Sequence, residues 1–173
     1  MPLVRILHAS FPWSGTMTFR VVGLDPSPFV PLYALSDDEL VARGARRVRV
    51  GADGGVPDRV ELRDLVDGEV ALLVNYVHQP AHSPYRASHA VYVREGATEA
   101  RIVDGGVPEV MRRRLLSLRA FDAAHMMAEA DVVDGVDADA RIVAMFANAD
   151  VDYIHVHYAR PGCFAARVER LVA

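Results

Sequence analysis

Two histidines, His155 and His157, alternate along a short β-prone segment near the end of the sequence. Side chains of a strand point alternately to its two faces, so Tyr153 shares one face with both histidines. The intervening residues form the other face, which we expect to lie against the core: Ile154, Val156 and Tyr158. Two imidazoles and a phenol in a row can exchange protons or bind a metal near neutral pH. We therefore predict that His155 and His157 are the catalytic acid/base residues and that Tyr153 binds ligand. The alternative is a solvent-facing strand that carries histidine without using it.

A second group of chemically active residues occupies the stretch NYVHQPAHSPYRASH, residues 75–89. We interpret it as a proline-bearing loop after a buried strand, and loops at strand ends often carry binding groups. The predicted ligand-binding residues in it are His78, Tyr85, Arg86 and His89. The alternative, stronger for His82, is an ordinary polar surface loop.

The cations of this sequence are all arginines, because it contains no lysine. Schiff-base chemistry is thereby excluded, and an anion would have to be held by arginine, histidine or backbone N–H groups. Arg160, just past the histidine strand, could make a bidentate contact to a carboxylate or phosphate. We predict a pocket for a small anionic molecule, with His155 and His157 as its floor and residues 75–89 at its rim.

Metal binding is an alternative for the same residues. A His-x-His strand with His78 or His89 as third ligand would give an open, three-ligand site of the catalytic zinc type. The usual small-barrel motif continues with a glutamate, whereas Arg160 occupies that region here. We therefore predict no cofactor, with zinc or another divalent metal as the alternative.

The single cysteine, Cys163, follows the histidine strand after the residues ARPG. A four-residue loop would pair it with Tyr158 and turn its sulfur away from the histidines, whereas a five-residue loop would place it opposite His157. We expect a buried, inert thiol.

Composition limits the class of protein. The 173 residues suit one domain, which we place at 17–173 after an N-terminal extension at 1–16. A net charge of −4 argues against a general nucleic-acid binder. No apolar run approaches the ~20 residues of a membrane-spanning helix. A lone cysteine fits a reducing compartment, so we expect a cytoplasmic protein.

Many short strand-like segments and few helices indicate an α+β fold, a single domain with a mainly antiparallel sheet and two or three short helices. Helices are expected after Ser36, Pro108 and Asp137, and DPSPFVP is expected to be an extended loop. The predicted strands are 18–22, 46–50, 59–63, 69–77, 90–94, 115–121, 127–133, 153–158 and 164–168.

Three segments, NYVHQPAHSPYRASHAVYVREG, VPEVMRRRLLSLRAFDAAHMMAEADVVDG and YIHVHYARPGCFAARVER, resemble the bacterial family catalogued as domain of unknown function 1203. The resemblance runs from about residue 17 to the C-terminus. It implies one domain and a bacterial origin, but supplies no catalytic residues.

Residues 153–161 also resemble the strand of histidine-triad nucleotide hydrolases and transferases. His155 would match the central nucleophile and His157 the last triad member, while Tyr153 replaces the first histidine. A further alternative is a non-catalytic module whose histidine face meets a partner or a second copy of the chain. A concave site with converging histidine and arginine would favour a small-molecule site, and a flat face would favour the module.

Overall fold

The computed structural model describes residues 18–171, and the expected extension at 1–16 lies outside them. The described chain forms four helices and eleven strands in two sheets. Every strand pairing is antiparallel except the short contact between β3 and β6. The predicted α+β class with a mainly antiparallel sheet is confirmed.

The first sheet carries the histidine strand. Its order is β7 (Ile102–Asp104), β1 (Thr18–Val22), β11 (Phe164–Leu171), β10 (Tyr153–Tyr158), β8 (Leu115–Phe121) and β9 (Met127–Asp134). The helices α3 (Glu109–Arg112) and α4 (Ala138–Phe146) contribute to the core on one face of this sheet. Ile154 and Val156 of β10 lie in that core with Ile142 and Phe146 of α4. The expected core face of the histidine strand is therefore confirmed.

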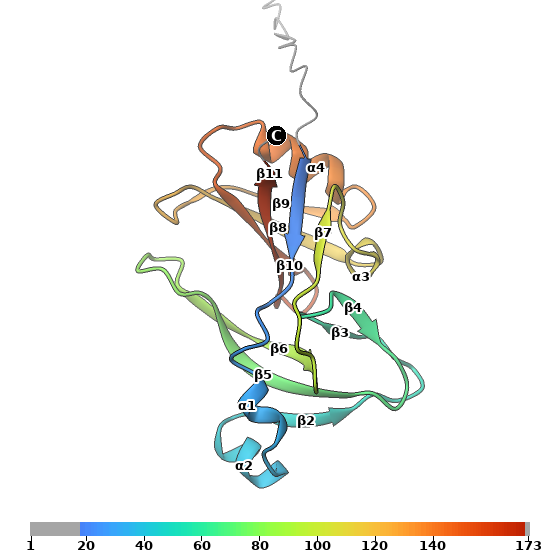
Figure 1. Ribbon diagram of the computed structural model, residues 1–173. Helices are drawn as coiled ribbons and strands as arrows, with labels where there is room; N and C mark the ends of the chain where they lie inside the picture. The colour runs from blue at the N-terminus through green and yellow to red at the C-terminus, as the bar shows by residue number, and fades with distance from the viewer. Residues whose placement is uncertain (1–17, 172–173) are drawn as a thin grey trace, which may run out of the picture.

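The second sheet lies beside the first (Figure 1). Its order is β2 (Arg46–Arg49), β5 (Val70–Gln79), β6 (Ala87–Arg94), β3 (Val56–Asp58) and β4 (Arg63–Leu65). The short helices α1 (Val30–Tyr33) and α2 (Asp37–Ala42) lie at its outer side in Figure 1. Leu40 of α2 packs with Leu72 and Val91 of the central strands. The interior position predicted for residues 69–77 is confirmed, since β5 pairs on both sides.

Local signals placed the helix α2 correctly. The Ser36 hydroxyl accepts a hydrogen bond from the backbone N–H of Glu39, and the Glu39 carboxylate accepts one from the backbone N–H of Ser36. Gly44 follows the helix at φ +70°, a conformation that glycine adopts without strain. The segment DPSPFVP, by contrast, was wrongly predicted to be wholly extended. Pro31 lies in the first turn of α1, where its missing N–H costs no helical hydrogen bond.

The strand predicted at 59–63 is wrong. Residues 59–62 form the turn between β3 and β4, and Leu62 takes φ +51°. The buried carboxylate of Asp58 accepts hydrogen bonds from the backbone N–H groups of Glu61 and Arg94. A side chain that binds backbone N–H groups in this way competes with strand pairing, and the alternation in the sequence does not reveal it.

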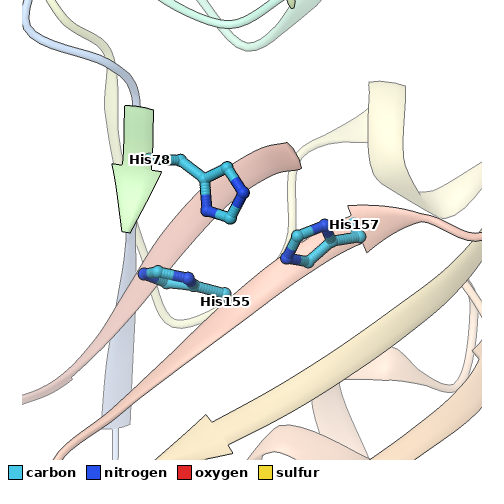
Figure 2. A group of neighbouring side chains, drawn as sticks. All are labelled: His78, His155 and His157. Atoms are coloured by element: carbon cyan, nitrogen blue, oxygen red, sulfur yellow. The ribbon is translucent and has the colours of Figure 1, made fainter. Parts of the chain in front are cut away.

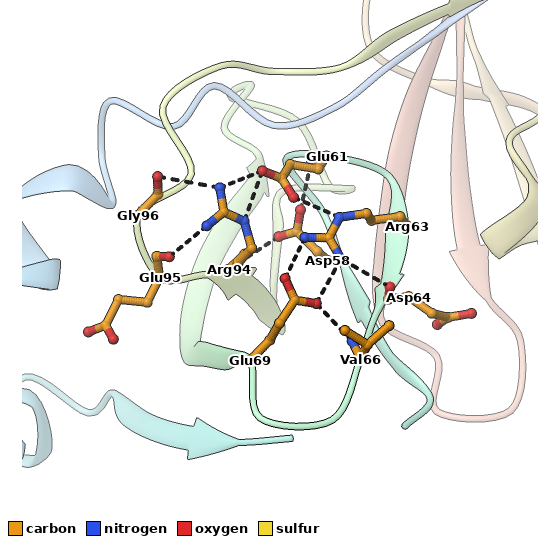
Figure 3. A network of polar contacts seen from close by, with 9 residues as sticks. All are labelled: Asp58, Glu61, Arg63, Asp64, Val66, Glu69, Arg94, Glu95 and Gly96. Carbon is orange, nitrogen blue, oxygen red and sulfur yellow. Dashed lines mark hydrogen bonds and ion pairs between the residues drawn. The ribbon is translucent and has the colours of Figure 1, made fainter. Parts of the chain in front are cut away.

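A network of ion pairs ties this turn to the second sheet (Figure 3). Glu61 pairs with Arg94 at 2.6 Å and with Arg63 at 2.9 Å. Arg63 also makes a bidentate contact to Glu69, at 2.6 and 2.8 Å, which lowers the Glu69 pKa to about 2. The network joins the β3–β4 hairpin to the start of β5 and the end of β6.

No helix in residues 18–171 is long and apolar enough to cross a lipid bilayer.

Candidate functional site

The histidine strand β10 is buried on both faces. All six of its residues, Tyr153–Tyr158, are shielded from solvent. One face lies in the core of the first sheet, and the other, with His155 and His157, lies against rings of the β5–β6 hairpin and β11. The alternative of a solvent-facing strand is therefore wrong, because the second sheet covers it.

The stretch 75–89 is a β-hairpin. Its ends belong to β5 and β6, and only residues 80–86 connect them, so the prediction of a loop over the whole stretch is wrong. The pairing of β5 with β6 ends at Gln79, directly before Pro80. His78 on β5 and His89 on β6 stack with ring centroids 4.7 Å apart, and the other face of the His78 ring stacks on Phe164 at 4.8 Å. These contacts join the hairpin to the first sheet.

Three histidines from the two sheets converge (Figure 2). One nitrogen from each of His78, His155 and His157 lies within 4.8 Å of the other two. Their side chains are almost completely buried, with residue exposures of 9%, 2% and 0%. We call these three residues the histidine cluster. The two stretches singled out in the sequence thus meet in space.

Several nitrogens of these rings lack a partner. Within residues 18–171, the buried nitrogens without a hydrogen-bond partner are both ring nitrogens of His78, Nδ1 of His89, Nδ1 of His155 and Nε2 of His157. The other nitrogen of His157, Nδ1, lies 3.2 Å from the backbone carbonyl of Gly162 and donates to it. That bond fixes the tautomer and leaves a lone pair on Nε2, as in many histidine ligands of metals.

Burial keeps the cluster uncharged. It lowers the pKa of His78 to about 4, that of His155 to about 3 and that of His157 to about 2. The neighbouring histidines, Arg119 and Arg167 lower these pKa values further, by smaller amounts. Since these effects lower the pKa values, the rings are neutral imidazoles at neutral pH.

Arg119 of β8 is a candidate site residue that the sequence analysis missed. It is the cross-strand partner of His155, and its charge lowers the pKa of all four histidines named above. Burial lowers its own pKa, and no carboxylate of residues 18–171 pairs with it. The available signal was the alternation in LLSLRAF, which places Ser117 and Arg119 opposite the core-facing Leu116 and Leu118.

Tyr153, the first residue of β10, lies on the same face as His155 and His157. Its hydroxyl accepts a hydrogen bond from Gln79 Nε2 at 2.6 Å and lies 2.9 Å from Nδ1 of His125. The guanidinium of Arg167 lies 3.8 Å from the centre of the phenol ring. His125, in the turn between β8 and β9, was not among the predicted site residues.

The predicted rim residues lie farther out. Tyr85 contacts the ring of Phe121 at 5.8 Å, close to the Tyr153 end of the face. Arg86 is exposed and donates to the carbonyl of Pro80 within its own turn. Arg160 lies elsewhere, in the wall of a separate cavity together with Cys163.

Cys163 follows a four-residue turn. The backbone N–H of Tyr158 donates to the Cys163 carbonyl at 3.0 Å, and both side chains line that separate cavity. The sulfur therefore lies away from the histidine cluster, as the four-residue alternative for this loop required. The thiol is partly buried and lies 3.0 Å from Nη2 of Arg59.

The fold and the site together define a two-sheet α+β protein with a buried cluster of neutral histidines between the sheets. Residues 55–170, more than half of the chain, match the family model described as "Protein of unknown function (DUF1203)". The chain belongs to that family, as its three characteristic segments predicted. No curated protein and no solved structure matches it.

Proposed function

We propose that this protein binds one divalent transition-metal ion, with zinc the first candidate, through His78, His155 and His157. The observation that carries the proposal is the convergence of buried imidazole nitrogens that lack hydrogen-bond partners in the described chain. A buried polar group without a partner costs about 1–3 kcal/mol. A shared metal ion would satisfy one nitrogen of each ring at once.

The geometry is compatible with coordination after small side-chain rotations. Ligand nitrogens of a tetrahedral zinc site lie about 3.3 Å apart, given Zn–N bonds of about 2.0–2.1 Å. The cluster nitrogens lie within 4.8 Å of one another. Neutral imidazoles suit zinc, copper, nickel and cobalt, and the low pKa values mean that no proton has to leave first.

The surroundings of the cluster favour an anion at the remaining coordination position. The charged neighbours that act on the rings are Arg119 and Arg167. Arg167 is paired with Glu169 at 3.1 Å, whereas Arg119 has no carboxylate partner in residues 18–171. A metal ion bound beside the uncompensated charge of Arg119 needs negative charge close by, which a small anionic molecule would supply. We therefore propose that the metal and Arg119 together bind the small anion predicted from the sequence.

The low pKa values do not favour a direct acid/base role for the cluster. A general acid or base works best with a pKa near the working pH, and those of His155 and His157 lie near 3 and 2. We infer that these two residues act as ligands.

The lone cysteine supports a proposal about location. The sulfur of Cys163 accepts a hydrogen bond from Arg59, and the sequence has no second cysteine with which it could form a disulfide. The protein therefore needs no oxidising compartment to fold. We propose that it works in the cytoplasm.

The test is metal analysis of protein purified without a polyhistidine tag. We expect elemental analysis to find about one metal ion per chain, and calorimetric titration of chelator-treated protein with zinc to give one site. The variant His155→Leu should bind zinc at least about 100-fold more weakly, because one of three ligands is lost. Cobalt(II) should give the visible absorption of a tetrahedral site in the wild type only.

The matched control is His82→Ala. His82 lies on the exposed turn of the same hairpin as His78, so its loss should leave zinc affinity unchanged. Circular dichroism melting curves would confirm that each variant is folded. Equal zinc binding by folded His155→Leu and wild type would refute the proposal.

A further inference from the structure

A cavity lies on the opposite side of the histidine strand from the histidine cluster. Its volume is about 580 Å³, within the range of small-molecule sites. Its walls include Arg59, Tyr92, Arg114, Tyr158, Arg160 and Cys163. Tyr158 occupies the core-facing side of β10, so the cavity and the histidine cluster lie on different faces of that strand.

Arg59 is the most unusual residue of this cavity. It is 1% exposed, and its guanidinium lies 5.1 Å from the ring centre of Tyr158. It donates to the backbone carbonyls of Phe164 and Pro57 and to the sulfur of Cys163. No carboxylate in residues 18–171 lies within ion-pair distance of it. A buried charge without a counter-ion costs several kcal/mol.

The hydrogen bonds of Arg59 leave donors free. A guanidinium carries five N–H groups, and three are used in the bonds above. Two remain, one on each terminal nitrogen. Such N–H groups make charge-assisted hydrogen bonds to carboxylate oxygens.

The other charged residues around the cavity determine which ligand charge it favours. Three further arginines of the wall are already paired: Arg112 with Asp139, Arg113 with Glu109, and Arg114 with Asp64. Within the described chain Arg160 has no acidic partner, and Asp134, the one acidic residue of the wall, is exposed. Counting Arg59 and Arg160 against Asp134 leaves one net positive charge.

We propose that this cavity binds a small organic monocarboxylate. Its carboxylate pairs with Arg59 and Arg160, and its apolar or aromatic body lies beside the rings of Tyr92 and Tyr158. The single negative charge of a monocarboxylate matches the single net positive charge of the cavity. A phosphate dianion would bring a second negative charge, for which the cavity has no matching positive charge. The site is separate from the proposed metal site and does not depend on it.

The test is an NMR titration of ¹⁵N-labelled protein, with benzoate as the monocarboxylate probe and benzamide as its neutral isostere. We expect benzoate to shift the Nε–H signal of Arg59 and the amides around the cavity, while benzamide leaves them unchanged. Arg160→Gln should weaken benzoate binding about tenfold, the effect of one charge-assisted hydrogen bond. Arg46→Gln, an exposed arginine on β2 outside the cavity wall, is the matched control.

Two further comparisons make the result decisive. Benzoate should bind the variant His155→Leu as well as the wild type, which separates this site from the histidine cluster. Phenyl phosphate should bind more weakly than benzoate, and tighter binding would overturn the monocarboxylate preference. Equal shifts from benzoate and benzamide, or benzoate shifts confined to residues outside the cavity, would overturn the site itself.

Discussion

Acidification of the metal-free protein should unfold it, because the histidine cluster is buried in its neutral form. The unfolded chain takes up protons on these histidines at their ordinary pKa near 6.5, whereas the folded chain takes them up only near 4, 3 and 2. Between those limits the unfolded state binds more protons, so the free energy of unfolding falls as the pH falls. The contribution is fully present above pH 6.5 and is lost progressively below it.

The size of the effect follows from the shifts. At pH 5, a histidine that titrates at 6.5 when unfolded and well below 5 when folded costs about 2 kcal/mol of stability. The three cluster histidines together cost about 6 kcal/mol. That loss is comparable to the whole stability of a typical domain, about 5–15 kcal/mol. Near pH 5 the free energy of unfolding should change by about 1.4 kcal/mol per pH unit for each histidine. For the three histidines together the change is about 4 kcal/mol per pH unit.

The assay is urea unfolding of chelator-treated protein, followed by circular dichroism at several pH values between 8 and 5. The variant His155→Leu removes one of the three protons, so its slope should fall by about a third. His82→Ala, with its exposed side chain, should keep the wild-type dependence on pH. The carboxylates whose pKa values are lowered, such as Glu69 at about 2, lose their contribution mainly below pH 4.5 and outside this window.

A flat profile between pH 7 and 5 would refute this reasoning. It would mean that the folded protein accepts protons on the cluster, which requires an acidic partner or solvent near the rings. An equal slope in His155→Leu and wild type would likewise assign the pH dependence to other groups. NMR signals of the histidine rings would distinguish these two outcomes.

Two further substitutions test the packing around the site. Tyr153→Phe removes the hydroxyl that binds Gln79 and His125. The free energy of unfolding in urea should fall by about 1–3 kcal/mol, because the Gln79 side chain is left buried without that partner. An unchanged urea midpoint would show that the hydrogen bond does not contribute to stability. Gly135→Ala places a methyl group 2.0 Å from the backbone carbonyl of Met111, so the backbone must move and the melting temperature should fall by several degrees. An unaltered melting temperature would contradict that close approach.

Much of the histidine strand was predictable because its geometry is local. Alternation alone placed Tyr153, His155 and His157 on one face, and the core residues between them on the other. The helix after Ser36 and the strands that became β8 and β9 were likewise encoded by neighbouring residues. Such features depend on backbone geometry and short-range hydrogen bonds, which a single sequence carries.

The cluster itself required tertiary information. Nothing in the spacing of residues 75–89 and 153–163 indicates that the β5–β6 hairpin covers the first sheet. Arg119 was missed for the same reason, since its importance arises only from the histidines that pack beside it. Arg59 lay in a predicted strand, and its burial depends on Phe164 and Cys163, more than a hundred residues away.

The cluster is better explained by ligand binding than by stability. Three neutral imidazoles with partnerless nitrogens occupy positions between two sheets where leucine or phenylalanine would pack without that cost. Proteins tolerate such destabilising groups where a binding site needs them. Unfolding measured at pH 8 distinguishes the two explanations. Metal-free His155→Leu should be at least as stable as metal-free wild type, whereas zinc should stabilise only the wild type. If the leucine variant is instead several kcal/mol less stable, the ring of His155 is a packing element, and the case for a metal ligand at that position fails.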